Sequence, residues 1–212
     1  MTAYVRPPIP RQTFVGPDGV EFQYGHRWDV SGPPEDTYSV DSHPERFAPL
    51  HAVADALVKH LVATYDVEVD EGDDALGDFS RVLAHRVARA VRLRPASASA
   101  APLTVVWEGY PGVQVHAGAL FEHGAPWCGC DACDETAESA AEQLEDLLLA
   151  VAENGFEEEV DLVSRWHAVT MTRQGGSSRS GGLVDVTDDR VAAAAARLAG
   201  LSGGWRPWPR RG

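Results

Sequence analysis

All three cysteines of this chain lie within six residues, at Cys128, Cys130 and Cys133. An odd number of cysteines cannot pair off completely, and a reducing cytosol would not preserve a disulfide. Thiolates crowded into one turn repel one another unless a cation neutralises them, and zinc takes four such ligands tetrahedrally. The run from Cys128 to Cys133 therefore predicts a turn that is stabilised by a bound zinc ion and constrains the elements on either side of it.

The fourth ligand of such a site is expected to be a nearby histidine. His123 precedes Cys128 at the end of a predicted strand and is the first choice. His116 is the second choice, because a hairpin also brings it near the cluster. A site of three cysteines and one histidine has no open position, and closed zinc sites are structural. An iron–sulfur cluster is disfavoured because its usual cysteine spacings are missing.

A catalytic alternative is a metal-dependent hydrolase that uses His116, Glu122 and His123. Glu122 lies beside His123 and is a candidate base near a zinc ion. Zinc deaminases need His-x-Glu before their cysteines, and Gly118 stands where that glutamate is required. The sequence also lacks a Walker loop and a dinucleotide fingerprint. It therefore favours a protein that is not an enzyme.

A Gly/Ser-rich segment at residues 174–182 predicts a flexible loop. Within it, Gly175, Gly176 and Arg179 are a weak candidate for binding an anion through backbone N–H groups and the guanidinium. The segment precedes a strand-like run rather than a helix, so it lacks the usual context of a phosphate-binding loop.

The charge of the chain limits its partners. Its 212 residues carry a formal net charge of −14 at pH 7. An acidic surface repels phosphate backbones and anionic lipids, which disfavours nucleic acids and membranes as partners. There is no apolar run of transmembrane length and no signal-peptide pattern, so a cytoplasmic location is expected. The predicted partner is another protein or a second copy of the chain in a homodimer.

Apolar spacing, capping residues and turn residues together predict the secondary structure. Helices are expected at residues 50–65, 79–94, 134–154 and 187–200. Strands are expected at residues 103–108, 113–120, 160–172 and 183–186. Consecutive strands joined by short turns favour an antiparallel sheet. The fold predicted is a single α+β domain with about four strands, about four helices and an extended Pro-rich N-terminal arm.

Three segments of different character divide the chain. Residues 1–42 are rich in Pro and Gly, which rules out long helices and predicts the extended arm. Residues 43–202 form the α+β domain with the cysteine cluster. Residues 203–212 form a Trp/Pro/Arg tail, and Trp205 and Trp208 are too large and apolar to stay in water. The tail is therefore expected to pack on the domain.

Three stretches carry a resemblance to a known family: residues 38–47, the Cys-Gly-Cys-Asp-Ala-Cys run at 128–135, and residues 205–211. Together they resemble a family of uncharacterised actinobacterial proteins. The resemblance implies a bacterial cytosolic setting and supplies no catalytic residues. The cysteine cluster, the acidity and the Trp/Pro/Arg-rich ends favour a metal-stabilised interaction or regulatory module, of which an immunity-type protein is one version.

Overall fold

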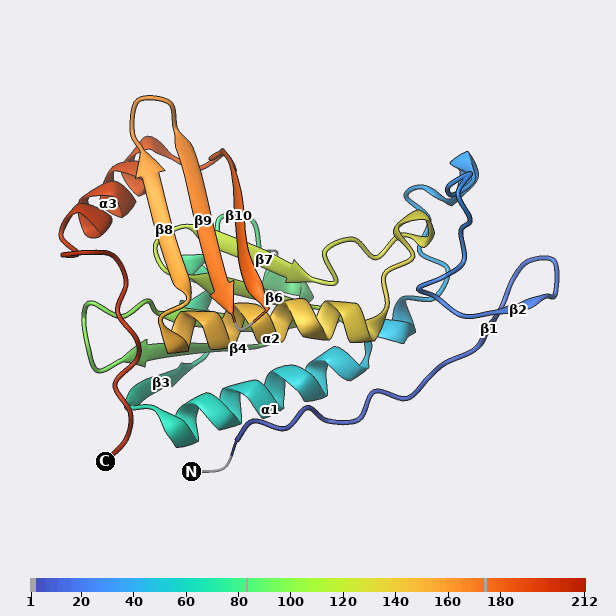
Figure 1. Cartoon of the computed structure of the whole chain (residues 1–212), viewed down its shortest axis with the longest axis horizontal. Coiled ribbons are helices and arrows are strands. Elements are labelled where there is room, and N and C mark those ends of the chain that lie inside the picture. Colours follow the sequence, from blue (N-terminus) through green and yellow to red (C-terminus); the bar gives the residue numbers. More distant parts are fainter. Residues whose placement is uncertain (1–2, 83, 174) are drawn as a thin grey trace.

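The structure is a computed structural model that describes residues 3–82, 84–173 and 175–212. Its larger sheet is an antiparallel meander whose strands are neighbours in chain order: β3 (Val67–Glu71), β4 (Val87–Pro95), β5 (Leu103–Glu108), β6 (Val113–Ala117) and β7 (Phe121–Ala125). One face of this sheet is covered by α1 (Pro49–Thr64) and α2 (Ala137–Glu153), as Figure 1 shows. The α+β class and the antiparallel pairing predicted from the sequence are confirmed.

A second antiparallel sheet packs on the other side of α2. It contains β8 (Phe156–Asp161), β9 (Trp166–Arg173) and β10 (Gly176–Leu183), in the order β10-β9-β8. Helix α2 contacts β7, β8 and β9, so it lies between the two sheets (Figure 1). This position explains why its buried residues, from Ala140 to Ala152, are not confined to one stripe. Helix α3 (Asp188–Ala199) packs against β8.

The N-terminal arm runs along the helices and ends in a small lobe with the cysteine turn (Figure 1). The ring of Tyr4 packs edge-on against His60 of α1, and Arg6 forms an ion pair with Glu145 of α2. The lobe holds the short hairpin β1 (Phe14–Val15) and β2 (Glu21–Phe22). Short 3₁₀ turns complete the fold: η1 (Glu35–Thr37), η2 (Pro44–Phe47), η3 (Asp73–Asp78), η4 (Ala84–Arg86) and η5 (Asp131–Cys133).

The helix predicted at residues 79–94 is wrong, because the second half of this range belongs to strand β4 and a short 3₁₀ turn, η4, precedes it. The prediction rested on apolar residues spaced four apart, and four is also a multiple of the two-residue repeat of a strand. In β4 the side chains of Val91 and Leu93 are buried in the core, while Arg92 and Arg94 lie on the opposite face. Leu83, within the same range, lies outside the described residues.

The prediction of a single sheet with about four strands is also incomplete, because the described residues form ten strands in three sheets. The range 160–172 contains a turn that separates β8 from β9. The Gly/Ser segment is not a loop: from Gly176 to Leu183 it pairs with β9 as edge strand β10. Backbone hydrogen bonds to β9 hold this strand despite the weak strand preference of Gly and Ser. Gln174 lies outside the described residues.

The C-terminal tail contributes two buried tryptophans to the core, Trp205 and Trp208. The indole N–H of Trp208 donates to the carbonyl of Ala101, and that of Trp205 donates to Glu158. Glu158 is a buried carboxylate that also accepts the backbone N–H groups of Ala119 and Leu120, at 2.8 Å each. His167 Nε2 lies 3.0 Å from the same carboxylate. The network joins the tail to both sheets.

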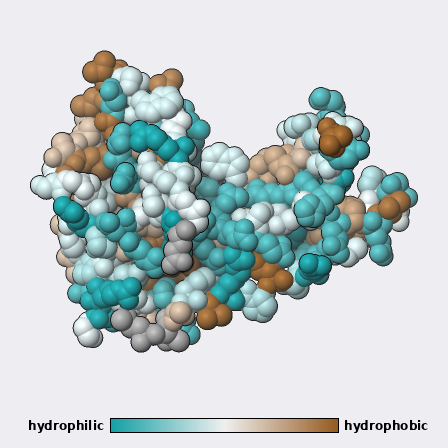
Figure 2. All heavy atoms as spheres, viewed as in Figure 1, coloured by the Kyte–Doolittle hydropathy of each residue, from teal (hydrophilic) through white to brown (hydrophobic). Residues whose placement is uncertain are grey.

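The surface is mostly hydrophilic on the face shown in Figure 2. Apolar side chains gather there over the turn between β8 and β9, where Leu162 and Val163 are exposed, and at points along the arm. Among the described residues, no helix combines the length and the apolar character that crossing a bilayer requires.

The start of α2 is fixed by a reciprocal cap. Thr136 Oγ1 accepts the N–H of Ser139, and Ser139 Oγ accepts the N–H of Thr136. We expect Thr136→Ala to lower the free energy of unfolding by about 1 kcal/mol, measured by urea denaturation. Thr187→Ala is the matched control, because Thr187 caps α3 without a side-chain hydrogen bond. Equal losses in the two variants would contradict the assignment of the cap.

Candidate metal centre

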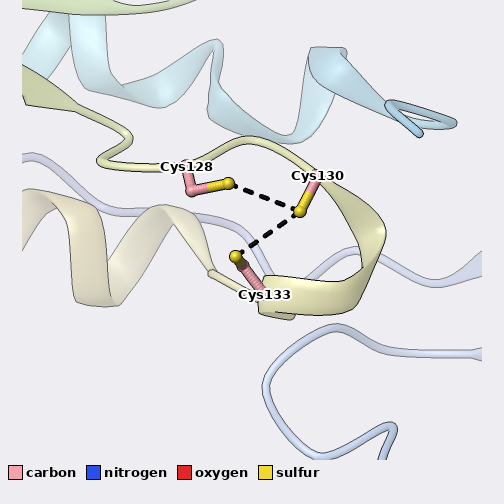
Figure 3. Close-up of side chains that lie close together, drawn as sticks. All are labelled: Cys128, Cys130 and Cys133. Atoms are coloured by element: carbon pink, nitrogen blue, oxygen red, sulfur yellow. Dashed lines mark hydrogen bonds between the residues drawn. The ribbon is translucent and has the colours of Figure 1, made fainter. Parts of the chain in front are cut away.

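The three cysteine side chains converge in the turn between β7 and α2. Figure 3 shows their sulfur atoms pointing toward one another across the turn. Cys128 Sγ lies 3.3 Å from Cys130 Sγ, which lies 3.4 Å from Cys133 Sγ. All three ligand atoms lie within 4.8 Å of one another. Zn–S bonds of about 2.3 Å in a tetrahedron separate the sulfurs by about 3.8 Å, so small side-chain movements would admit the ion.

The turn is closed by Glu135, whose carboxylate accepts the backbone N–H groups of Trp127 and Cys128 at 3.2 and 3.0 Å. Gly129 lies so close to Tyr110 that an added Cβ would stand 2.7 Å from the phenol oxygen. A larger residue at this position would have to displace the Tyr110 side chain, so glycine permits the close packing seen here. Cys133 ends η5, and Asp134 follows in the left-handed conformation at φ 53°. This reversal explains why α2 begins at Ala137 and not at Asp134.

Asp131, between the second and third cysteines, attaches the arm to this turn. Its carboxylate accepts the hydroxyls of Tyr24 and Ser42, both at 2.7 Å. Its backbone N–H donates to the carbonyl of Val40 at 2.7 Å, and its carbonyl accepts the indole N–H of Trp28. Burial tends to raise the pKa of Asp131, but the hydrogen bonds from Ser42 and Tyr24 and the charge of Arg27 hold it below its ordinary value. The carboxylate stays ionised.

Arg46 supplies a buried positive charge beside the thiols. Its side chain is almost fully buried, yet among the described residues no carboxylate lies within ion-pair distance. Its guanidinium donates to the carbonyl of Gly129, between the first two cysteines, at 2.7 Å and to that of Glu135, after the third, at 3.2 Å. It also stacks over the Tyr24 ring at 3.8 Å from the centroid. The guanidinium therefore ties η2 to the cysteine turn through backbone carbonyls.

The thiols influence one another strongly. Burial tends to raise the pKa of Cys130, but hydrogen bonds from the backbone of Cys133 and from the neighbouring thiols, together with the backbone of Ser39, lower it. Hydrogen bonds with Cys128 and Cys130 raise the pKa of Cys133 to about 12. The thiols therefore differ in acidity, with the pKa of Cys130 below its ordinary value and that of Cys133 above it.

Two histidines lie near the cluster, from different directions. His123, the predicted fourth ligand, is on β7 and stacks on Trp127 with ring centroids 5.6 Å apart. Its Nε2 is buried and has no hydrogen-bond partner among the described residues, but it is not part of the group of three close sulfurs. His26 of the arm borders a hollow of about 490 Å³ together with Cys128 and Cys133. Like His123, His26 is not part of the group of close ligand atoms, but its place at this hollow makes it a second candidate, which the sequence did not suggest.

The residues of the hydrolase hypothesis are not brought together. His116 on β6 pairs directly with Glu122 on β7, so these two share one face of the sheet. His123 pairs with Val115 and lies on the opposite face, because successive strand residues alternate. Gly118 has a positive φ of 67°, and a Cβ there would stand 2.3 Å from Glu158. The position where deaminases carry glutamate therefore excludes any side chain.

The residues of the weak anion site predicted in the Gly/Ser segment are not brought together either. Gly175 and Gly176 border a hollow of about 530 Å³ with His123 and Arg173. Arg179 does not border this hollow, and its guanidinium pairs with Glu159 at 2.9 Å. Its preferred partner is thus a carboxylate of its own sheet.

Sequence reasoning missed His26, Arg46 and the role of Asp131. Arg46 and Asp131 do lie in two of the stretches that carry the family resemblance, residues 38–47 and 128–135. The family resemblance of these two stretches is the one sequence feature that links Arg46 to Asp131, because no periodic pattern connects segments so far apart.

Comparison with curated proteins and with solved structures gives no match. A family model does match, and it covers residues 10–212, which include most of the arm, the three sheets, the cysteine turn and the tail. The predicted resemblance to an uncharacterised family is confirmed at this level, while the actinobacterial origin stays a prediction. The chain belongs to the family of unknown function DUF6226.

Proposed function

We propose that this chain is a non-catalytic cytoplasmic module in which a structural zinc ion, bound by Cys128, Cys130 and Cys133, fixes the N-terminal arm to the α+β body. The observation that carries the proposal is the convergence of three sulfurs in the same turn whose Asp131 binds the arm. Three thiolates suit zinc, and Arg46 holds the turn through the carbonyl of Gly129.

The experiment that tests the proposal is elemental analysis of purified protein. We expect about one zinc per chain, as a single site of this kind requires. Purification should avoid chelators and strong reductants that compete for the metal. Protein that is fully folded and free of metal would contradict the proposal.

We propose His26 as the fourth ligand in preference to His123, because His26 borders the same hollow as Cys128 and Cys133. His26→Ala should keep cobalt binding with thiolate-to-metal absorption, while the intensity of the d–d bands falls as the tetrahedral site opens to water. His123→Ala should leave the spectrum unchanged. His85→Ala, an exposed histidine of η4, is the control. A spectrum altered by His123→Ala alone would restore His123 as the ligand.

The partner of this module is proposed to be a protein. The net charge of −14 disfavours nucleic acids and anionic membranes. Among interaction proteins, an acidic immunity-type binder of a basic target suits this charge, whereas a homodimer would have to overcome the repulsion between two acidic chains. Co-purification from cells followed by size determination tests the proposal, and a chain that stays monomeric and binds only nucleic acid would contradict it.

A further inference from the structure

The outer face of the five-stranded sheet, remote from the cysteine turn, carries a second polar site. A hollow of about 510 Å³ lies there between the sheet, η3 and the first turn of α3. It is bordered by Arg92 and Arg94 of β4, His116 of β6, Arg190 of α3 and Asp78. Two of the three arginines are paired with carboxylates, Arg92 with Asp78 and Arg94 with Glu68 and Asp70 at the rim, which leaves Arg190 as the guanidinium of interest.

Arg190 keeps its charge available. Its guanidinium donates to the backbone carbonyls of Phe79, at 3.0 Å, and of Asp78. Within the described part of the chain it has no carboxylate partner, whereas Asp78 is already bound by Arg92 at 2.6 and 2.8 Å. Carbonyl partners orient a guanidinium without neutralising it, and several of its N–H donors are left over. Arg190 is therefore oriented as an anion ligand.

His116 is, after Arg190, the second residue of this site with an unusual environment. Its side chain is 95 % buried, since its exposed fraction is 5 %, and its Nε2 has no hydrogen-bond partner among the described residues. Buried polar atoms are almost always hydrogen-bonded, so an orphaned one at the edge of a hollow indicates a partner from outside the chain. Burial holds the pKa of His116 below its ordinary value, although the charges of Asp78, Glu122 and Glu158 act in the opposite direction.

We infer that this hollow binds the oxyanion group of a small molecule, with Arg190 and Arg94 as charged ligands and His116 as a neutral hydrogen-bond donor. Arg94 pairs with Glu68 and Asp70 at the exposed rim, where ion pairs are weak and easily exchanged. Guanidinium groups bind phosphate and carboxylate alike. The volume exceeds that of a single oxyanion and leaves room for the organic part of the ligand.

The test is an NMR titration of isotope-labelled full-length protein at constant ionic strength, with inorganic phosphate in one arm and malonate in the other. The backbone resonances of His116, Gly118 and Ala119 should shift saturably in at least one arm, with a dissociation constant near or below about 1 mM. The arm that saturates at lower concentration identifies the oxyanion. Absence of saturable shifts in both arms up to about 20 mM would overturn the inference.

Two variants decide whether the anion binds where we infer. Arg190→Gln should weaken binding at least tenfold, about 1.4 kcal/mol, because it removes the arginine without a carboxylate partner. Arg179→Gln, which removes an arginine paired with Glu159 on the other sheet, should leave binding unchanged. If Arg190→Gln fails to fold, Arg94→Gln at the exposed rim replaces it and should also weaken binding. If Arg190→Gln, or Arg94→Gln in its place, folds and binds the anion with wild-type affinity, the assignment is overturned.

Discussion

Cys130→Ser is expected to lose its zinc and to unfold at a temperature roughly 10 °C below that of the wild type. Structural zinc contributes on the order of 10 kcal/mol in small zinc domains. Here the extensive core formed by α1, α2 and the sheets should keep the body folded without the metal, so the loss is partial. Thermal unfolding monitored by circular dichroism, with and without a chelator, measures the effect.

The chelator provides the decisive comparison. It should lower the melting temperature of the wild type to that of Cys130→Ser and leave the variant unchanged. Cys133→Ser should behave like Cys130→Ser, and His85→Ala, an exposed control, should behave like the wild type. If the wild type and Cys130→Ser unfold alike and the chelator changes neither, the three thiols do not bind a structural metal.

Glu158→Ala is expected to lower the free energy of unfolding by about 3–5 kcal/mol. The substitution leaves the buried donors of Ala119, Leu120 and Trp205 without an acceptor and removes the partner of His167. Each unsatisfied buried donor costs about 1–3 kcal/mol, although losses within one network are not additive. Urea denaturation measures the change.

Glu157→Ala is the matched control for this prediction. Glu157 precedes Glu158 on β8 but is exposed, so its replacement should change the free energy of unfolding by less than about 0.5 kcal/mol. Glu158→Gln, which keeps one acceptor oxygen, should lie between the two. A loss in Glu158→Ala no larger than that of the control would show that the network does not stabilise the fold.

Local patterns were sufficient to predict the helices that became α1, α2 and α3, because each has apolar residues at helical spacing between clear boundary residues. The cysteine cluster could also be predicted from a local pattern, because its three residues lie within six positions. The range 79–94 was misread because Val87 and Val91 satisfy both a helical and a strand repeat. The Gly/Ser strand β10 escaped prediction because its stability comes from the ladder to β9 rather than from its own residues.

The surroundings of the cysteine site could not be predicted for a different reason. Tyr24 is 107 positions from Asp131, and Ser42 is 89 positions away. Contacts of this range leave no periodic pattern in the sequence, so Arg46 and His26 could not be assigned to the site. The same holds for Arg190, whose contacts to η3 span more than a hundred positions.

The attachment of the arm at Asp131 has a consequence for local opening. The backbone N–H of Ser42 donates to Asp131, that of Arg27 donates to Asp134, and that of Asp131 donates to Val40. These amides exchange with solvent only when the lobe detaches, an event that need not unfold the sheets. Their protection against hydrogen exchange should therefore follow the occupancy of the thiol site, while amides in the centre of β5 should report global unfolding. The lobe would then behave as a separate cooperative unit whose opening is controlled by the metal.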